Sequence, residues 1–336
     1  MSFRELMDSR YKEILETYIK KQEEQALYLG QKFSRKTIEH HVSPEEIISL
    51  HKSAILEMEP ELSEKVLNSF DILLEVMIGY GFAYREHQSL RSKQQELNNE
   101  IDIASNMQQT LLGTKIPETE ELDIGAISVP ARKMNGDYHH FVQDDNEVVS
   151  VAIADVIGKG IPAALCMSMI KYAMESLPEH RQDPSSVLES LNRVVEQNVD
   201  ISMFITMFYG MYNLDNHVFT YASAGHEPGF YYRSSTNQFE DLDAKGLLLG
   251  VDKKARYQAY ERKVDIGDMI ILFSDGVTEC RTEEGFIERK DIIQLIRNYQ
   301  HLSSQEIVNN VYKELEKLQH FELRDDFTLI IVKRIS

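Results

Sequence analysis

The sequence predicts an α+β protein in which an all-α N-terminal region and a helical linker precede a domain of two packed sheets. Three observations support this fold class. Apolar residues recur with helical spacing from residue 3 to residue 112, and Gly113 and Pro117 then end the pattern. Beyond them, short apolar runs alternate with amphipathic segments that carry helix-capping residues. Many strands follow one another directly, which indicates antiparallel sheets packed face to face and covered by helix pairs.

The N-terminal region, residues 1–82, is expected to form a helical regulatory domain. A first helix covers residues 3–30 approximately. A second begins after Ser43, a natural N-cap, with Pro44 at the first helical position and Glu46 closing a capping box. A third helix starts a few residues after the second ends. Three helices offer little core at this length, so we expect this domain to dimerise.

Residues 83–112 are expected to form a coiled-coil linker. Apolar residues repeat every seven positions from residue 73 onward, which is typical of a coiled coil. One seam position holds Val76, Ala83, Leu90, Leu97, Ala104 and Leu111, and the other holds Leu73, Tyr80, His87, Gln94, Ile101 and Gln108. The polar members of the second seam predict weak pairing. A long amphipathic helix packed on its own domain is the alternative, and two glycines near residue 80 favour a joint there.

The remaining region, residues 118–336, shows eight strand patterns and four helix patterns. The expected strands are Leu122–Val129, Val148–Asp155, Met203–Tyr212, Val218–Ser223, Gly229–Arg233, Tyr257–Val264, Met269–Phe273 and Phe327–Lys333. The expected helices are Pro162–Leu177, Pro184–Asn198, Arg289–Gln300 and Ser304–Leu318. Asp183 and Ser303 are expected to cap the second and fourth of these helices.

The chain carries a net charge of −19 at pH 7 and is acidic in both halves. Phosphate backbones demand basic surfaces, so nucleic acid is not expected as substrate or partner. Charges interrupt the N-terminus, and no apolar run reaches the roughly 18 residues that a membrane span needs. Neither a signal peptide nor a membrane span is therefore expected. The two cysteines, Cys166 and Cys280, are far apart, which predicts reduced thiols and a cytoplasmic location.

Four segments place an aspartate at the end of a strand or in a glycine turn. They are Asn135-Gly136-Asp137-Tyr138, Asp155-Val156-Ile157-Gly158-Lys159-Gly160, Ser274-Asp275-Gly276-Val277-Thr278-Glu279 and Arg324-Asp325-Asp326-Phe327-Thr328. Each alone is a weak signal, because Asp and Gly are common in turns. Together they would gather carboxylates that repel one another at pH 7 unless cations neutralised them. Oxygen ligands without a nearby His or Cys cluster favour a hard cation such as Mg²⁺ or Mn²⁺.

These segments, with Ala224-Gly225-His226-Glu227-Pro228, occur in the order of the motifs of the PPM-type, metal-dependent serine/threonine protein phosphatases. The chain resembles the bacterial sporulation stage II E (SpoIIE) branch of that family over about residues 118–336. The resemblance implies an α-β-β-α sandwich and a phosphoric monoester hydrolase with two divalent cations, Mn²⁺ or Mg²⁺. No Cys-x5-Arg loop is present in the sequence, so a cysteine nucleophile is not expected.

By matching motifs, the resemblance implies that Asp155 bridges both metals and that the Val156 carbonyl assists at one of them. Asp137 would serve the metal that it shares with Asp155. The substrate-binding residues would be Gly158, Lys159 and Gly160, whose glycines let the backbone pass close to the site.

The resemblance also implies that Asp275 and one aspartate of the Asp325–Asp326 pair hold the other metal. Asp325 is preferred over Asp326 because it stands three residues before Thr328, as the family's ligand does. Both remain metal-ligand candidates, and Asp137, Asp155, Asp275 and Asp325 are the expected catalytic residues.

Two departures from the family pattern surround the first aspartate. Asn135 stands where a glycine is usual, and His139-His140 stand where an acidic residue often follows, so no third metal ligand is expected there. His226 is either a general acid or a structural residue of its turn, and the structural role is the preferred interpretation.

The helical region and linker ahead of the phosphatase domain resemble the regulatory phosphatases of the general-stress sigma-factor pathway. This implies a substrate that is a serine-phosphorylated anti-sigma-factor antagonist of the STAS fold, and a kinase-like activator that binds the N-terminal domain. We expect a cytoplasmic homodimer. The alternative is a non-catalytic dimeric scaffold whose phosphatase-like domain only binds partners. The intact aspartate segments argue against a scaffold, which gains nothing from clustered like charges.

Overall fold

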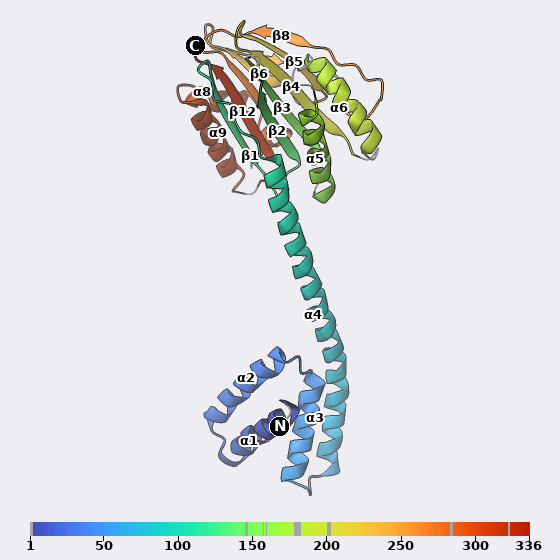
Figure 1. Ribbon diagram of the computed structural model, residues 1–336. Coiled ribbons are helices and arrows are strands. Elements are labelled where there is room, and N and C mark those ends of the chain that lie inside the picture. Colours follow the sequence, from blue (N-terminus) through green and yellow to red (C-terminus); the bar gives the residue numbers. More distant parts are fainter. Residues whose placement is uncertain are drawn as a thin grey trace. The chain divides into compact units, whose positions relative to one another are not determined.

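The structure is a computed structural model, and it describes residues 3–144, 147–156, 158, 160–177, 183–199, 203–282, 285–321 and 323–336. The chain divides into two compact units, residues 1–99 and 100–336, which are described separately below. In Figure 1, helices and strands of both units are labelled where there is room.

The first unit is helical, as expected, but it holds one helix more than the sequence suggested. Its helices are α1 (Phe3–Lys21), α2 (Glu24–Glu39), α3 (Pro44–Met58) and the first half of α4 (Glu64–Leu112). The prediction of a single helix over residues 3–30 is wrong. Gln22 adopts a left-handed φ of 54°, which ends α1, and a new helix starts two residues later.

The remaining helix signals of the first unit are confirmed. Ser43 accepts the N–H of Glu46 and the Glu46 carboxylate accepts the N–H of Ser43, so the capping box is present. The predicted joint near residue 80 is wrong, because α4 is continuous there. A Cβ at Gly81 would lie 2.0 Å from Oε2 of Glu45 on α3, so the Glu45 carboxylate would have to move if this residue had a side chain.

The second unit contains two five-stranded sheets in which every strand pair is antiparallel. The first sheet has the order β1 (Leu122–Val129), β12 (Phe327–Arg334), β9 (Met269–Phe273), β6 (Gly229–Arg233) and β7 (Gln238–Leu242). The second sheet has the order β2 (Asp137–Gln143), β3 (Val148–Val156), β4 (Ile205–Asn213), β5 (Val218–Ala224) and β8 (Tyr260–Lys263). Two short strands, β10 (Arg281–Thr282) and β11 (Gly285–Phe286), pair with each other.

Helices cover the outer faces of both sheets, so the unit is the expected α-β-β-α sandwich (Figure 1). Helices α5 (Ile161–Glu175) and α6 (Pro184–Asn198) lie on the β2-to-β8 sheet, and α9 (Ser304–Leu318), flanked by α8 (Arg289–Tyr299), lies on the other. A short helix, α7 (Asp275–Thr278), follows β9. Three buried apolar clusters fill the two helix–sheet layers and the space between the sheets.

The elements missed from sequence lie mostly at polar stretches. β2 was missed although it carries one of the aspartate motifs, because Asp137-Tyr138-His139-His140 has no apolar run to signal a strand. β7 was missed for the same reason, since its sequence is Gln-Phe-Glu-Asp-Leu. The expected strand over residues 257–264 is shorter, and β8 covers only its second half.

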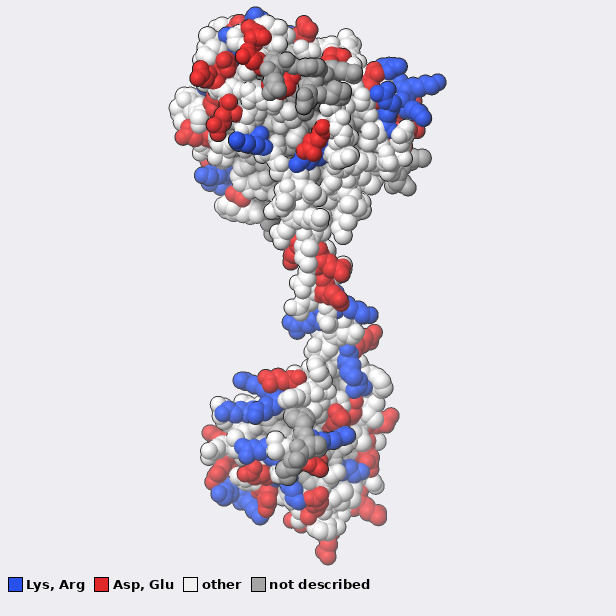
Figure 2. All heavy atoms as spheres, viewed as in Figure 1, with Lys and Arg blue, Asp and Glu red and all other residues white. Residues whose placement is uncertain are grey.

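Three further expectations can be compared with the structure. Cys166 and Cys280 are both free and buried. Among the described helices, only α4 is long and apolar enough to cross a membrane, with a mean hydropathy of 1.4 over one 18-residue stretch. This is weak support for a span, because Asp71 in the apolar half of α4 pairs with Lys52 of α3. Figure 2 shows acidic side chains scattered over the visible described face of the catalytic unit, with one group of basic side chains at an edge and others elsewhere on the face.

Candidate metal centre

The register of the β2–β3 pair brings the first two aspartates together. Asp137 begins β2 and is the direct partner of Asp155 near the end of β3. Directly opposed residues of an antiparallel pair project from the same face of the sheet, with Cβ atoms about 5 Å apart. The two carboxylates therefore occupy the same end and the same face of the β2-to-β8 sheet.

Asp326 approaches this pair from the other sheet. One of its carboxylate oxygens accepts the N–H of Ala131 at 2.7 Å, and the other accepts the N–H of Gly136. A Cβ at Gly136 would lie 3.0 Å from Oδ2 of Asp326 and 3.7 Å from Oδ1 of Asp155. A side chain at this position would thus crowd the carboxylates, which explains the glycine before Asp137.

Asp275 and Asp325 form a neighbouring group at the ends of β9 and β12. Asp275 opens α7 directly after β9, and a Cβ at Gly276 would lie only 2.0 Å from the carbonyl oxygen of Asp326. This glycine therefore allows α7 to pack against the backbone of residues 325–326. Burial, followed by the negative charges of Asp325 and Glu279, raises the pKa of Asp275 to about 6.

Asp137 is the most buried carboxylate of the set, with 3% of its surface exposed. Burial raises the pKa of Asp137 well above its ordinary value; the Ser274 and Thr328 hydroxyls lower it in part, and the charges of Asp155 and Asp326 raise it further. Its Oδ2 atom is buried and has no hydrogen-bond partner among the described residues. A buried, unpaired carboxylate oxygen beside other carboxylates is costly without a cation.

The donor set fits a hard divalent cation, since the atoms that meet here are carboxylate and backbone oxygens. The aspartates form two adjacent groups, one with Asp137, Asp155 and Asp326 and one with Asp275 and Asp325. Within the described residues, no three carboxylate, imidazole or thiol groups are gathered tightly enough to enclose an ion as they stand. The assignment of individual ligands, including Asp325 over Asp326 and the carbonyl of Val156, stays a prediction.

Within the glycine loop after β3, the structure describes Gly158 and Gly160. Gly160 adopts φ 81° and ψ −149°, a conformation open only to glycine, and it immediately precedes α5. The carbonyl oxygen of Gly158 would lie 3.6 Å from a Cβ at Gly136, so this loop borders the aspartates. Lys159 lies outside the described residues. A substrate-binding role of this loop stays a prediction.

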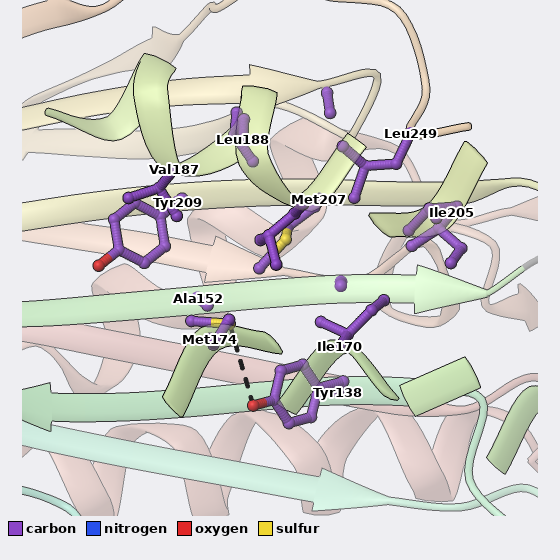
Figure 3. Close-up of a cluster of buried hydrophobic side chains, with 14 of the residues drawn as sticks. Tyr138, Ala152, Ile170, Met174, Val187, Leu188, Ile205, Met207, Tyr209 and Leu249 are labelled. Carbon is purple, nitrogen blue, oxygen red and sulfur yellow. Dashed lines mark hydrogen bonds between the residues drawn. The ribbon is translucent and has the colours of Figure 1, made fainter. Parts of the chain in front are cut away.

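Packing of Tyr138 in the apolar core fixes the position of the start of β2. Tyr138 follows Asp137 and is 1% exposed, and its hydroxyl lies 4.0 Å from the sulfur of Met174 on α5. Figure 3 shows this contact within the apolar cluster, where Tyr138 also lies beside Ile170. The aspartate is therefore attached to a rigid part of the core.

His226 links the two sheets near the aspartates. Its Nδ1 lies 2.9 Å from the Thr206 hydroxyl on β4, and its Nε2 lies 3.2 Å from the carbonyl oxygen of Phe273 on β9. Because a carbonyl only accepts, Nε2 carries the proton and Nδ1 accepts from Thr206. Burial lowers the pKa of His226 to about 4, so the imidazole is neutral at pH 7. These contacts support the structural interpretation of the Ala-Gly-His-Glu-Pro turn.

The histidine pair of β2 takes part in aromatic packing. His140 stacks on Tyr138 with ring centroids 5.9 Å apart, and His139 meets Phe141 edge-on at 6.2 Å. Burial lowers the pKa of His139 to about 4.

Two residues that order the site were missed from sequence. Asn135 donates from Nδ2 to the Ser128 hydroxyl at 2.8 Å and accepts the N–H of Asp137 at 3.0 Å, so it closes the turn before the aspartate. Gln108 on α4 hydrogen-bonds to both backbone groups of Asn135. Its placement in a coiled-coil seam is wrong here, because its side chain is buried against the catalytic unit. In the sequence, a buried glutamine that faces a loop gives the same heptad pattern as a polar residue in a coiled-coil seam.

Two antiparallel sheets between helix layers, with aspartates from both sheets at one end, define a PP2C-type protein phosphatase domain. A family model described as Stage II sporulation protein E (SpoIIE) matches residues 145–335, and one described as phosphoserine phosphatase RsbU, N-terminal domain, matches residues 9–83. The chain belongs to the RsbU family of phosphoserine phosphatases, and its catalytic domain is of the SpoIIE type.

Individual relatives agree with this placement. The chain is 62% identical over 334 residues to phosphoserine phosphatase RsbU of Bacillus subtilis (strain 168), and the match covers 99% of each chain. The SiaA-PP2C domain of Pseudomonas aeruginosa has a TM-score of 0.61 at 18% identity, covering 73% of this chain and 98% of that chain. RsbX in complex with magnesium has a TM-score of 0.50 at 21% identity, covering 66% and 98%. The two structures support the fold alone.

Proposed function

We propose that this phosphatase removes phosphate from a serine of a STAS-fold anti-sigma-factor antagonist, an RsbV-like protein, and so activates a stress sigma factor. We propose that it does so in the cytoplasm with two divalent cations, Mn²⁺ or Mg²⁺. The observation that carries the metal part is the buried Oδ2 of Asp137, which has no hydrogen-bond partner in the described parts of the chain and lies beside the charges of Asp155 and Asp326. RsbX, which shares the fold, was solved in complex with magnesium.

Bound cations would lower the pKa of a bridging water and neutralise the phosphoryl oxygens during in-line attack. Asp155 would hold both ions, Asp137 would hold one, and Asp275 with Asp325 would hold the other. Asp326 uses both carboxylate oxygens to fix the backbone at Ala131 and Gly136, so its first task is to orient the loop.

The chain's own residues would position the phosphoserine and need not form a covalent intermediate. Phosphoryl transfer depends mostly on positioning and charge stabilisation. Gly158 and Gly160 carry no side chain and both have positive φ, which would let a phosphorylated segment approach the backbone at these two residues. Cys166 and Cys280 are buried in the helix–sheet layers and are not placed to act as nucleophiles.

The test uses the full chain and an RsbV-like antagonist phosphorylated on serine. Phosphate release should require Mn²⁺ or Mg²⁺, should stop in excess chelator and should return when the metal is restored. p-Nitrophenyl phosphate serves as a generic substrate and separates a failure of catalysis from a wrong choice of protein substrate. Undiminished phosphate release in excess chelator would contradict the metal-dependent mechanism.

We also propose that a kinase-like, RsbT-like activator binds the N-terminal unit, and that this unit forms a homodimer. Large apolar side chains are exposed on the first unit and offer surfaces for a second copy and for the activator. They include Leu6, Ile19, Leu27, Tyr28, Ile72, Val76 and Tyr80. Burial of such a surface is the usual source of association free energy.

The linker is proposed to pair with that of the second copy when the activator binds. Leu90 and Leu97 occupy one seam position, and 60% and 55% of their surfaces are exposed in the single chain. A coiled coil would cover them. Because the seam also contains His87 and Gln94, its pairing would be marginal, and the activator could shift the equilibrium by preferring the paired state.

A further inference from the structure

Three side chains on the last turns of α4 contact a single short segment of the catalytic unit. Asp102 forms an ion pair with Lys133 at 2.6 Å, and Ser105 donates a hydrogen bond to the carbonyl oxygen of Lys133. Gln108 contacts Asn135. The spacing of three residues places all three on one side of the helix. This side of α4 therefore lies along residues 133–135, immediately before Gly136 and Asp137.

The Gln108 contact is the most specific of the three. Its Nε2 donates to the carbonyl oxygen of Asn135 at 2.7 Å, and its Oε1 accepts the N–H of Asn135 at 3.0 Å. Only one orientation of the amide satisfies both bonds. The residue is 5% exposed, so both hydrogen bonds are shielded from solvent in the folded chain. Ser105 is buried as well, whereas the Asp102–Lys133 pair is half exposed and contributes little.

Hydrogen bonds of Asn135 and of its neighbour Gly136 reach three candidate ligand residues. Its side chain accepts the N–H of Asp137. The next residue, Gly136, donates to the carboxylate of Asp326 and accepts the N–H of Val156 through its carbonyl oxygen. A shift of the Asn135 backbone would therefore change the positions of aspartates that come from both sheets.

We propose that Gln108 is a positioning residue for the metal centre, which it serves by holding the backbone of Asn135 so that the Gly136–Asp137 turn is ordered for a cation. The inference rests on the proposed metal-dependent function. The last turns of α4 are then part of the phosphatase site. Any event that moves or unwinds them changes the affinity for the cation, whereas the turnover number at saturating cation stays the same.

A role in packing alone makes a different prediction. If Gln108 only fastens α4 to the catalytic unit, its loss lowers thermal stability in the absence of metal and leaves the intrinsic affinity for Mn²⁺ unchanged. If it positions the turn, its loss weakens Mn²⁺ binding, and saturating Mn²⁺ restores the turnover number without a change in KM for the phosphoprotein. Residues that orient metal ligands typically change affinity by about 10-fold to 100-fold when replaced.

The experiment compares full-length wild type with Gln108→Leu, which removes both hydrogen bonds at similar volume. Gln109→Leu is the matched control, because Gln109 is the neighbouring glutamine of the same helix and is exposed. Mn²⁺ binding is measured directly, from the electron paramagnetic resonance signal of free Mn²⁺ during titration. We expect about tenfold weaker binding for Gln108→Leu, wild-type binding for Gln109→Leu, and recovery of turnover of phosphorylated substrate at saturating Mn²⁺.

Gln108→Asn is the second variant, since it keeps an amide but is one methylene too short to reach Asn135. It should show the same weaker binding, and it decides the matter if the leucine variant does not fold. Wild-type Mn²⁺ affinity in a folded Gln108 variant overturns the proposal, as does an equal loss in Gln109→Leu. Absence of Mn²⁺ binding by wild type would refute the proposed metal-dependent function itself, and the positioning role would fall with it.

Discussion

Asp137 and Asp155 are direct partners across β2 and β3, so two carboxylates of the candidate site face one another from adjacent strands. Like charges in such a pair destabilise the sheet. The charges of Asp155 and Asp326 add to the burial that raises the pKa of Asp137, and a cation between the side chains would offset this repulsion.

The first prediction follows from this pair. Asp155→Ala should abolish Mn²⁺-dependent phosphatase activity while the metal-free variant remains folded and gains roughly 0.5–1 kcal/mol in free energy of unfolding, because a like-charge repulsion is removed. Phosphate release and denaturant unfolding in chelator measure the two effects. Full activity in the variant would contradict the two-metal mechanism.

The second prediction concerns pH. Burial holds the pKa of His226 at about 4, below its ordinary value of 6.5. Above pH 6.5 the imidazole is neutral in both the folded and the unfolded state, so its stabilisation of the folded state is fully present. As the pH falls from 6.5 to about 4, only the unfolded state takes up the proton. The free energy of unfolding therefore falls by about 1.4 kcal/mol per pH unit because of this residue.

His226→Gln tests that sign, since glutamine can still donate to the Phe273 carbonyl and accept from Thr206 but does not titrate. Its free energy of unfolding in chelator should fall less steeply than that of wild type between pH 6 and pH 4.5. Comparison at each pH cancels the titration of the other groups. Identical slopes in the two proteins would show that His226 is not neutral in the folded state.

The third prediction concerns the linker. Gln94→Leu should strengthen the proposed seam and raise phosphatase activity in the absence of the activator. Charged residues in place of Leu90 and Leu97 should block activation and leave activator binding intact. Sedimentation and activity assays measure pairing and output. A tighter dimer that remains fully activator-dependent would mean that the signal passes through direct contact between the activator and the catalytic domain.

The fourth prediction concerns the N-terminal unit alone. A fragment of residues 1–82 should fold as a helical domain, dimerise and bind the activator. Pairing would cover the apolar side chains of α4, among which Ile72 and Tyr80 have 71% and 67% of their surfaces exposed. Sedimentation velocity at micromolar concentration tests the association, and a stable monomer would contradict it.

Local signals predicted the elements that have an apolar run or a cap. Strands β1, β6 and β9 have the predicted bounds, and so does α9, whose Ser303–Glu306 capping box is present. The aspartate segments were located because Asp and Gly in turns are visible in sequence. The position of Asp326, with both oxygens on backbone N–H groups, was not visible, because it depends on how the β1–β2 loop folds over β12.

The roles of Gln108 and Asn135 were hidden for a related reason, whereas a structural role of His226 was the preferred interpretation of the sequence. Gln108 acts through the backbone of Asn135, which is distant in sequence, and a backbone group carries no side-chain signature. Asn135 binds the Ser128 hydroxyl and the N–H of Asp137, and a turn sequence does not show which partners its amide takes. A polar residue in a heptad pattern predicts a weak seam equally well whether it faces a second helix or a loop of its own chain. Only the structure shows that Gln108 faces Asn135.

The candidate ligands are divided between the sheets: Asp137 and Asp155 belong to one sheet, while Asp275, Asp325 and Asp326 come from strand ends of the other. A cation held by both sets would cross-link the two sheets at the end of the sandwich where the aspartates lie. The sheets could then separate at this end only after the cation is released. Because only the closed sandwich brings the sets together, cation binding would add directly to the free energy of unfolding. Cellular Mn²⁺ or Mg²⁺ would then govern how long the enzyme survives as well as how fast it works.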